Sequence, residues 1–528
     1  MISKTNLSLS VLAMAAFFSG PLQADVKPNP LFTDGAVLQR GQPVQVWGTA
    51  RDGEKVSVEI DGQKISATAA AGKWNVNLKP LKEGGPFTMK ITGDNTVTIN
   101  NLLVGEVWVC SGQSNMEWTF AKAHNAKEEG PKASYPKIRM FTVKKKVSAK
   151  PLAEAEGSWV ECSPQTVNGF SAVGYFFARD IHQKLSVPVG MIHTSWGGTP
   201  AQAWTSLEGF GSDPELKEYV DAAKQRLATY DADLAAYAKN MEELKSKTKE
   251  WNETVGKAYQ EALKAWTEAT AQAKKAGQPL PPKPAPSSPQ PKAPPHPDGG
   301  SGNPTTLYNG MVAPIIPYGI KGTIWYQGES NATKSKQYRT LFPAMIADWR
   351  NRWNQGDFPF FFVQIAPYNG QPPEIREAQF LTLSKVKNTA MAVTTDVGDA
   401  GNIHPTQKEP VGQRLALAAR ALTYGEKIEY SGPLYDSMTE KDGKIILTFK
   451  HVGGGLIAKD GELKGFTIAG EDKKFVPAHA KIEGLTVVIS AEGVTHPKAA
   501  RYGWTNVPDV NLFNKEGLPA SPFRTDVD

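Results

Sequence analysis

The sequence has few cysteines, no block of charge of one sign, and no long apolar run after its first residues. Its 528 residues include two cysteines, which exclude a disulfide scaffold and an all-cysteine zinc site. The net charge of +6 is small for this length and spread along the chain, so the composition gives no support for nucleic-acid binding. The eight histidines lack the spacing of metal-binding motifs. We therefore expect neither a metal nor a cofactor.

The first 24 residues have the pattern of a secretory signal peptide. Lys4 supplies a positive charge, and residues 7–18 are apolar apart from small serines. This stretch is too short to span a membrane comfortably, so we predict that it is cleaved and that the mature protein is periplasmic or secreted, without a membrane span. Such a compartment is oxidising and favours a disulfide between Cys110 and Cys162, whereas the apolar run before Cys110 favours a buried free thiol.

Changes in hydrophobic period divide the rest of the chain. Apolar and polar residues alternate with period two in residues 25–103 and 425–528, which predicts two β-domains, the first like a β-sandwich. Between them, buried apolar runs alternate with helical patterns, which indicates an α/β domain with a mostly parallel sheet. This domain comprises residues 104–209 and 301–424, and an insertion at 210–300 interrupts it.

The insertion has two unlike parts. Apolar residues recur at spacings of three and four over residues 213–276, which predicts a long helical arm with a heptad seam. Residues 279–297 contain ten prolines, which exclude a helix and favour extended polyproline II. Two arrangements fit: a helical hairpin that buries the seam, or one continuous helix returned by the proline-rich segment. The arm is also a candidate for self-association.

The strongest sign of chemistry lies at the end of the apolar run Val107–Val109. A buried strand ends near Gly112 and leads into a short polar turn that contains Ser114. Open α/β folds place their sites at such carboxyl ends of strands, so Ser114 is the candidate nucleophile. The turn reads Gly-x-Ser-Asn-Met and lacks the second glycine of the Gly-x-Ser-x-Gly elbow, so an α/β-hydrolase fold is not predicted.

A serine nucleophile requires a base, and His404 is the first candidate. It follows the predicted strand at residues 390–394, in a loop that also carries carboxylates able to orient an imidazole. His193 also follows a buried strand, and His124 lies soon after Ser114 and is held in reserve.

An acyl-transfer site also needs donors for an oxyanion. The segment around Gly198 follows one predicted strand and offers unhindered backbone N–H groups, and Asn331 follows another and offers its side-chain amide. With the N–H of Ser114, these would make an oxyanion hole.

Four successive strand ends thus supply Ser, Gly, Asn and His, an order that resembles the SGNH hydrolases. The match is closest to the sialate O-acetylesterase branch and its acetylxylan-esterase relatives, from about residue 30 to residue 525 outside the insertion. It rests on these segments: Gly112–Trp118, Leu307–Met311, Trp325–Ala332, Ile403–Pro405 with Lys408, Gly412 and Arg414, Arg501–Asn506, and Gly517–Ala520.

The resemblance implies a three-layer α/β/α hydrolase domain and an O-acetylesterase that acts on carbohydrates through an acetyl-enzyme on Ser114. Acetyl esters of sialic acid are the substrate it implies first. Acetylxylan or another acetylated glycan is the alternative, and a glycan-binding relative without activity is the second alternative.

One position departs from the family pattern. Members commonly carry an Asp two or three residues before the His, where this chain has Asn402 and Gly401. An amide cannot stabilise an imidazolium as a carboxylate does. We favour Asp399 as the orienting acid, and the alternatives are Asp396, Glu329 or a Ser–His dyad with backbone support. Supporting roles around the site are expected for Gln113, Gln327, Glu329, Asp396 and Asn402.

Overall fold

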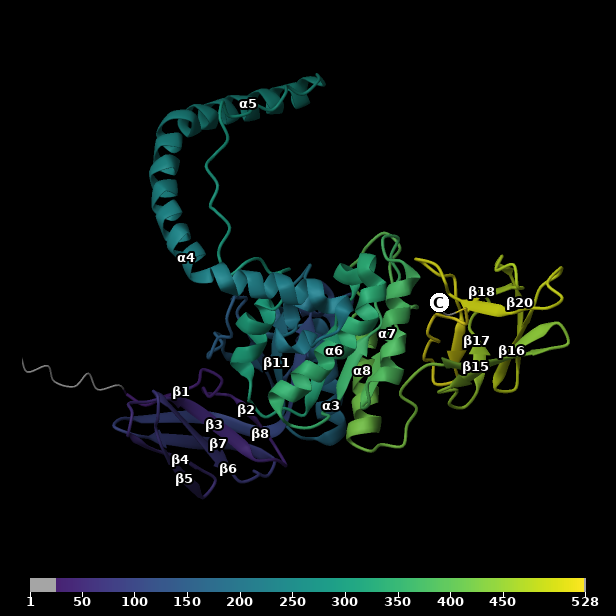
Figure 1. Ribbon diagram of the computed structural model, residues 1–528, viewed down its shortest axis with the longest axis horizontal. Helices are drawn as coiled ribbons and strands as arrows, with labels where there is room; N and C mark the ends of the chain where they lie inside the picture. The colour runs from purple at the N-terminus through teal and green to yellow at the C-terminus, as the bar shows by residue number, and fades with distance from the viewer. Residues whose placement is uncertain (1–24, 527–528) are drawn as a thin grey trace, which may run out of the picture.

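The computed structural model describes residues 25–526 (Figure 1). The signal-peptide prediction for residues 1–24 lies outside the described residues. No helix within 25–526 is both long and apolar enough to cross a bilayer. β-strands from the two ends of the chain lie on opposite sides of a central body of strands and helices, and a long helical arm projects from that body.

The period-two pattern of the N-terminal residues forms antiparallel strands. In β4, the buried residues Val56, Val58 and Ile60 alternate with more exposed ones, as a sheet with one solvated face requires. One sheet holds β1 (Lys27–Pro28), β3 (Val44–Thr49) and β6 (Lys73–Leu78). The other strands are β2 (Val37–Gln39), β4 (Lys55–Ile60), β5 (Gln63–Thr68), β7 (Gly84–Thr92) and β8 (Thr96–Gly112).

Strand β8 belongs to two parts of the molecule. Its first half pairs antiparallel with β7, and its second half lies at the centre of the sheet order β10-β9-β11-β8-β12-β13-β14. Neighbours in that order run parallel except β10 with β9. The strand runs unbroken past residue 103, the predicted end of the N-terminal β-domain. The other strands are β9 (Tyr135–Thr142), β10 (Trp159–Cys162), β11 (Val189–Ser195), β12 (Gly322–Tyr326), β13 (Phe360–Val363) and β14 (Thr389–Ala392).

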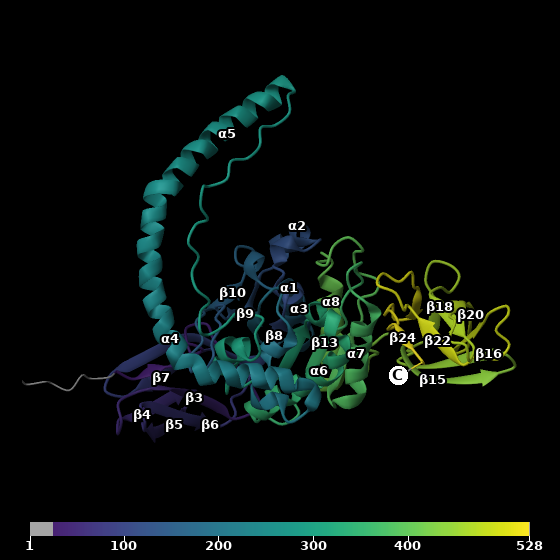
Figure 2. The same ribbon diagram turned by 45° about the horizontal axis from the view of Figure 1, so that its top comes forward.

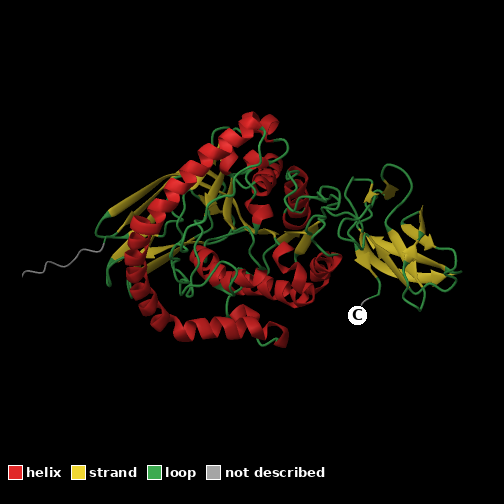
Figure 3. Cartoon of the chain, turned by 90° about the horizontal axis from the view of Figure 1, so that it is seen from above, coloured by secondary structure: helices red, strands yellow, loops and turns green. Residues whose placement is uncertain are grey.

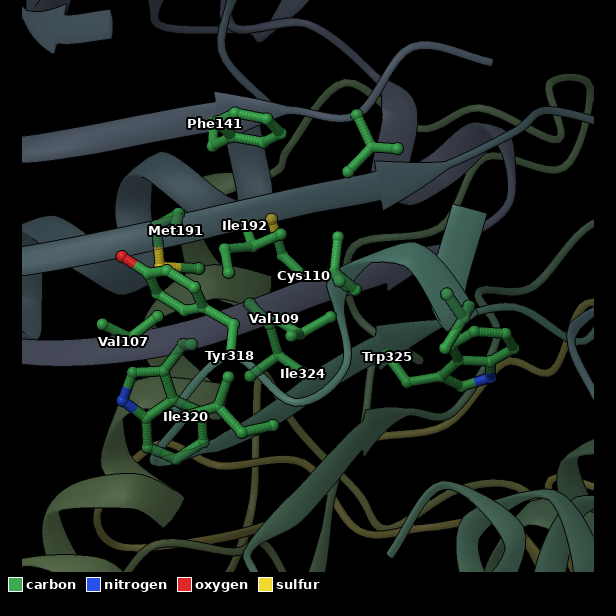
Figure 4. Close-up of a cluster of buried hydrophobic side chains, with 14 of the residues drawn as sticks. Val107, Val109, Cys110, Phe141, Met191, Ile192, Tyr318, Ile320, Ile324 and Trp325 are labelled. Carbon is green, nitrogen blue, oxygen red and sulfur yellow. The ribbon is translucent and has the colours of Figure 1, made fainter. Parts of the chain in front are cut away.

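The core of the central body lies between this sheet and its helices. Every residue of β8 from Leu102 to Gly112 is buried, as expected for a parallel strand that is covered on both faces. Figure 4 shows Val109, Ile192 and Ile324 side by side from three adjacent strands. The main helices are α3 (Ala172–Leu185), α6 (Ser335–Trp353), α7 (Pro373–Lys385) and α8 (Glu409–Ala418); α3 contacts α8, and α6 contacts α7.

The two cysteines do not form a disulfide. Both are buried and free, and two strands separate β8, which carries Cys110, from β10, which carries Cys162. The disulfide alternative is therefore wrong, and the buried-thiol alternative holds. Burial raises the pKa of Cys162 to about 12, so its thiol stays protonated at neutral pH.

The arm is one continuous helix returned by an extended segment, the second of the two predicted arrangements. Helix α4 (Lys217–Trp251) passes through a π-helical turn into α5 (Lys257–Ala276) (Figure 2), and the helix curves in the view from above (Figure 3). The proline-rich segment returns along it. The indole Nε1 of Trp251 donates to Ser288 O at 3.0 Å, and that of Trp266 to Pro281 O at 2.9 Å. Self-association through the arm stays a prediction.

The C-terminal β-region has a core of its own and is fastened to the central body. The Arg376 guanidinium on α7 donates to Asn506 O at 3.3 Å, and Arg524 pairs with Glu377 at 2.6 Å. Its four-stranded sheets are β15-β16-β21-β20 and β19-β18-β22-β24, with the pair β17-β23: β15 (Leu434–Lys441), β16 (Lys444–Lys450), β17 (Leu456–Ala458), β18 (Phe466–Ala469), β19 (Val476–Pro477), β20 (His479–Glu483), β21 (Thr486–Ser490), β22 (Ala499–Tyr502), β23 (Leu512–Asn514) and β24 (Phe523–Arg524).

The arm can be removed at its base, where its outgoing and returning segments lie together. Tyr230 Oη donates to Asp298 Oδ1 at 3.1 Å, so these two residues lie together. Replacing residues 231–297 by a short Gly/Ser linker should leave the thermal unfolding midpoint of the body within a few degrees, because a short loop closes this gap at small entropic cost. Circular dichroism or differential scanning fluorimetry measures the midpoint.

A longer deletion serves as the contrast. Removing residues 217–298 also takes away Tyr219 and Ala223, which are 5% and 2% exposed, and should lower the midpoint clearly. Equal destabilisation by both deletions would show that the distal arm itself stabilises the body.

Candidate active site

Three predicted blocks meet at one edge of the central sheet because parallel strands end together. In the register of the sheet, Gly112 of β8 lies opposite Ser195 of β11 on one side and Tyr326 of β12 on the other. A Cβ atom on Gly112 would lie 2.1 Å from Tyr326 O, so only glycine allows this approach. The chain then turns into the short helix α1 (Ser114–Glu117), which presents Ser114 at the edge.

The structure brings Ser114 and His404 together. His404 Nε2 lies 2.8 Å from Ser114 Oγ, within hydrogen-bond distance, and both side chains are partly buried. The histidine belongs to the loop after β14, and its backbone N–H donates to Asn402 Oδ1 at 2.9 Å. Through this hydrogen bond, the side-chain oxygen of Asn402 stabilises the backbone of the histidine loop.

The His404 imidazole is held by an aromatic ring. It stacks on the indole of Trp118, with centroids 5.3 Å apart and planes 23° from parallel. Burial lowers the pKa of His404 below its usual value, and the cations Lys408 and Lys122 lower it further. The ring is therefore neutral at neutral pH, the state that a general base requires.

None of the predicted carboxylates hydrogen-bonds to His404 within residues 25–526. Asp399 is exposed and accepts from Gly401 N at 2.9 Å. Asp396 forms a two-pronged ion pair with the Arg414 guanidinium at 2.7 and 2.6 Å. Glu329 is buried and bonded elsewhere. The role of Asp399 as orienting acid thus has no contact to support it, and the dyad alternative fits the geometry better.

Asn115 joins three of the blocks. Its Nδ2 donates to Glu329 Oε1 at 2.6 Å and to Ile403 O at 3.0 Å, and its Oδ1 accepts from Lys408 Nζ at 2.5 Å. Burial lowers the pKa of Lys408 to about 7, although Glu329 opposes this shift, and burial raises the pKa of Glu329. The residue after the nucleophile is thereby tied to the residue before His404.

Sequence reasoning missed this role of Asn115 and Lys408. Both stand inside the motifs that carry the family resemblance, which was the available signal. The sequence predicted only a supporting role for Glu329. It could not identify Asn115 as the partner of Glu329, because 214 positions separate the two residues.

The glycine block lies directly against the nucleophile. A Cβ atom on Gly197 would be 3.2 Å from Ser114 Cβ, and the Gly197 N–H donates to Glu117 Oε2 at 2.6 Å. Gly198, the predicted donor, is the next residue and is exposed. The glycine block therefore lies against Ser114 at Gly197, and the oxyanion role of the Gly198 N–H stays a prediction.

The predicted amide donor is oriented by the groups around it. Asn331 is 2% exposed, and its Oδ1 accepts from Ala201 N at 2.9 Å and from Gln327 Nε2 at 2.7 Å. Its Nδ2 donates one hydrogen to Gln202 Oε1 at 3.0 Å, and within residues 25–526 the second hydrogen has no acceptor. Gln113 Oε1 accepts from Ser330 N at 3.2 Å. Gln113 and Gln327, both predicted to support the site, therefore hold the segment around Asn331 in place.

The other two histidine candidates do not bond to Ser114. His193 is buried, its Nε2 lies 2.6 Å from Ser195 Oγ, and burial lowers its pKa to about 4. His124 is exposed and contacts the histidine loop through its backbone, donating to Thr406 O at 3.0 Å.

Comparison with known proteins identifies the family of this chain. The family model described as carbohydrate esterase, sialic acid-specific acetylesterase matches residues 104–237 and 300–421. Sialate O-acetylesterase of Rattus norvegicus is 31% identical over 437 residues, 74% of this chain and 72% of its own. That of Mus musculus is 30% identical over 535 residues, 90% of each chain.

A solved structure agrees over a still larger share of the chain. A carbohydrate acetylesterase from Xanthomonas citri is 33% identical and superimposes with a TM-score of 0.77, covering 96% of this chain and all of that one. The resemblance inferred from the motifs is thereby confirmed: this chain belongs to the sialate O-acetylesterase family and is an acetylesterase that acts on carbohydrates.

Proposed function

We propose that the protein is a secreted serine esterase that removes acetyl groups from O-acetylated sialic acid. The observation that carries the proposal is the 2.8 Å contact between Ser114 Oγ and His404 Nε2 at the carboxyl edge of a parallel sheet. The parallel strand order also supports an SGNH-type three-layer domain, and the pattern of residues 1–24 supports export.

The reaction has two halves. Ser114 Oγ attacks the acetyl carbonyl carbon while His404 Nε2 takes the hydroxyl proton, and a tetrahedral oxyanion forms. The N–H groups of Ser114 and Gly198 and the Nδ2 of Asn331 stabilise it. The bond between the acetyl carbon and the sugar oxygen then breaks, His404 returns the proton to that oxygen, and water hydrolyses the acetyl-enzyme by the same proton route.

His404 performs this role as one half of a dyad. Trp118 fixes the ring plane by stacking, and the π-face of an indole attracts the positive charge that the imidazolium gains during the reaction. The ring is thus oriented and its charge partly stabilised without a carboxylate.

Replacing the nucleophile tests the serine mechanism. Ser114→Ala should lower kcat for acetate release by about 10³-fold or more, because the acetyl-enzyme can no longer form. Ser195→Ala is the matched control, since Ser195 also bonds to a histidine, and it should keep most of the activity. A folded Ser114→Ala variant with most of its rate would refute the nucleophile.

Replacing the candidate acid separates the triad from the dyad. Loss of a triad carboxylate lowers kcat by about 10⁴-fold, so Asp399→Asn should leave kcat within about threefold if a dyad operates. Trp118→Leu should lower kcat by at least tenfold, because the imidazole loses its stacking partner. A loss near 10³-fold or more in Asp399→Asn would restore the triad.

The pH profile tests the state of His404. Its lowered pKa means that the neutral base persists to a lower pH than for an ordinary histidine. The acid limb of kcat/KM for the uncharged substrate p-nitrophenyl acetate should therefore have its midpoint below about 6.5. A midpoint at or above that value would contradict the burial and charge seen around the ring.

A further inference from the structure

Three lysines lie near the catalytic pair, and they differ in the groups that bind their ammonium groups. Lys145 Nζ forms an ion pair with Glu117 Oε1 at 2.5 Å. Lys408 is 1% exposed and donates to Asn115. Lys122 is exposed, and within the described part of the chain no carboxylate lies within ion-pair distance of it. Its charge is the one that remains available to a ligand.

Lys122 lies beside the catalytic pair. Its Nζ is 5.3 Å from the centre of the Trp118 ring, and that ring stacks on His404. Its positive charge also lowers the pKa of His404, after burial and Lys408. The ammonium group therefore lies close to the indole that stacks on the catalytic histidine.

The backbone on both sides of Lys122 is fixed. Phe120 is fully buried and its N–H donates to Phe170 O at 2.8 Å, and the N–H of Lys122 donates to Thr119 O at 3.0 Å. The N–H of His124 then donates to Thr406 O in the histidine loop at 3.0 Å. The short 3₁₀ turn at Phe120–Lys122 thus fixes the backbone of the lysine relative to the histidine loop.

The chemistry of this group suits an acidic sugar. Sialic acid carries a carboxylate that is ionised at neutral pH, as α-carboxyl groups are, whereas the acetylated units of xylan are neutral. A charge-assisted hydrogen bond from an ammonium to a carboxylate is stronger than one between neutral groups. A neutral sugar would gain no such bond.

We propose that Lys122 binds the carboxylate of O-acetylated sialic acid and makes the site selective for acidic over neutral acetylated sugars. This inference rests on the proposed function, because it names the group that recognises the substrate of that site. Lys122 is a specificity residue here and takes no part in the transfer of the acetyl group.

The experiment compares one sugar with and without its charge. The substrates are a mono-O-acetylated N-acetylneuraminic acid and its C1 methyl ester, which keeps the acetyl group and removes the negative charge. The measured quantity is the ratio of kcat/KM for the free acid to that for the methyl ester, at low ionic strength, where exposed charges are screened least.

The wild type should prefer the free acid by on the order of tenfold, mainly through KM, which corresponds to one charge-assisted hydrogen bond. Lys122→Gln should bring the ratio to about one, and Lys122→Arg should keep most of the preference. Lys137→Gln is the matched control, since Lys137 is exposed at the amino end of β9, the opposite end of the sheet from Ser114, and it should leave the ratio unchanged.

A wild type that hydrolyses both forms equally, or a Lys122→Gln variant that keeps the preference, overturns the inference while the proposed function stands. Hydrolysis of p-nitrophenyl acetate and acetylated xylo-oligosaccharides without hydrolysis of either sialic acid form overturns the sialic acid substrate and the inference together. A wild type without turnover of any acetyl ester, p-nitrophenyl acetate included, overturns the serine esterase itself.

Discussion

The site depends on the parallel pairing of β8 with a strand on each side. This pairing brings the ends of three strands to one edge, and the glycine at the end of β8 allows the chain to pass close to the carbonyl of Tyr326 before it turns into Ser114. The serine is therefore placed by backbone hydrogen bonds that run through the whole central sheet. Its position does not rest on the loop that carries it.

A second constraint fixes the base relative to this edge. The histidine loop enters from β14, two strands beyond β12 in the sheet, and Asn115 fastens it through Ile403 O and Lys408. The amide can do this because it donates and accepts at once. A buried lysine with a lowered pKa and a buried glutamate with a raised pKa are then joined through Asn115 in one small polar cluster, and burial shifts both toward their neutral forms.

Local sequence predicted the parts of this site that local rules govern. The apolar run of β8, the polar turn after it and the loop around His404 were visible, because strand ends and turns have short-range signals. The lack of a carboxylate bonded to His404 was not predictable. The contacts of Asp396 and Asp399 go to Arg414 and Gly401, and no spacing rule distinguishes these from a contact with the histidine.

The arm shows the same limit. A heptad seam is equally compatible with a hairpin and with a single helix, because both cover the same apolar stripe. In the structure, the indole N–H groups of Trp251 and Trp266 donate to carbonyl oxygens of the proline-rich segment, which are available because extended polyproline II has no internal hydrogen bonds. Composition identified the segment as extended but could not show that it lies along the helix.

The pairing of β8 also bears on the order in which the chain can fold. Tyr326 pairs with Gly112 across more than 200 residues, and the entire arm is synthesised between them. The amino-terminal half of β8 can join β7 as soon as both exist, since only a short turn separates them. Its carboxyl-terminal half can pair with β11 on one side, but on the other side it must wait for β12, which is made much later, and such distant pairing is slow. The strand that carries the nucleophile is therefore partly folded early and completed late, and during that interval the edge that β12 will cover is open to solvent.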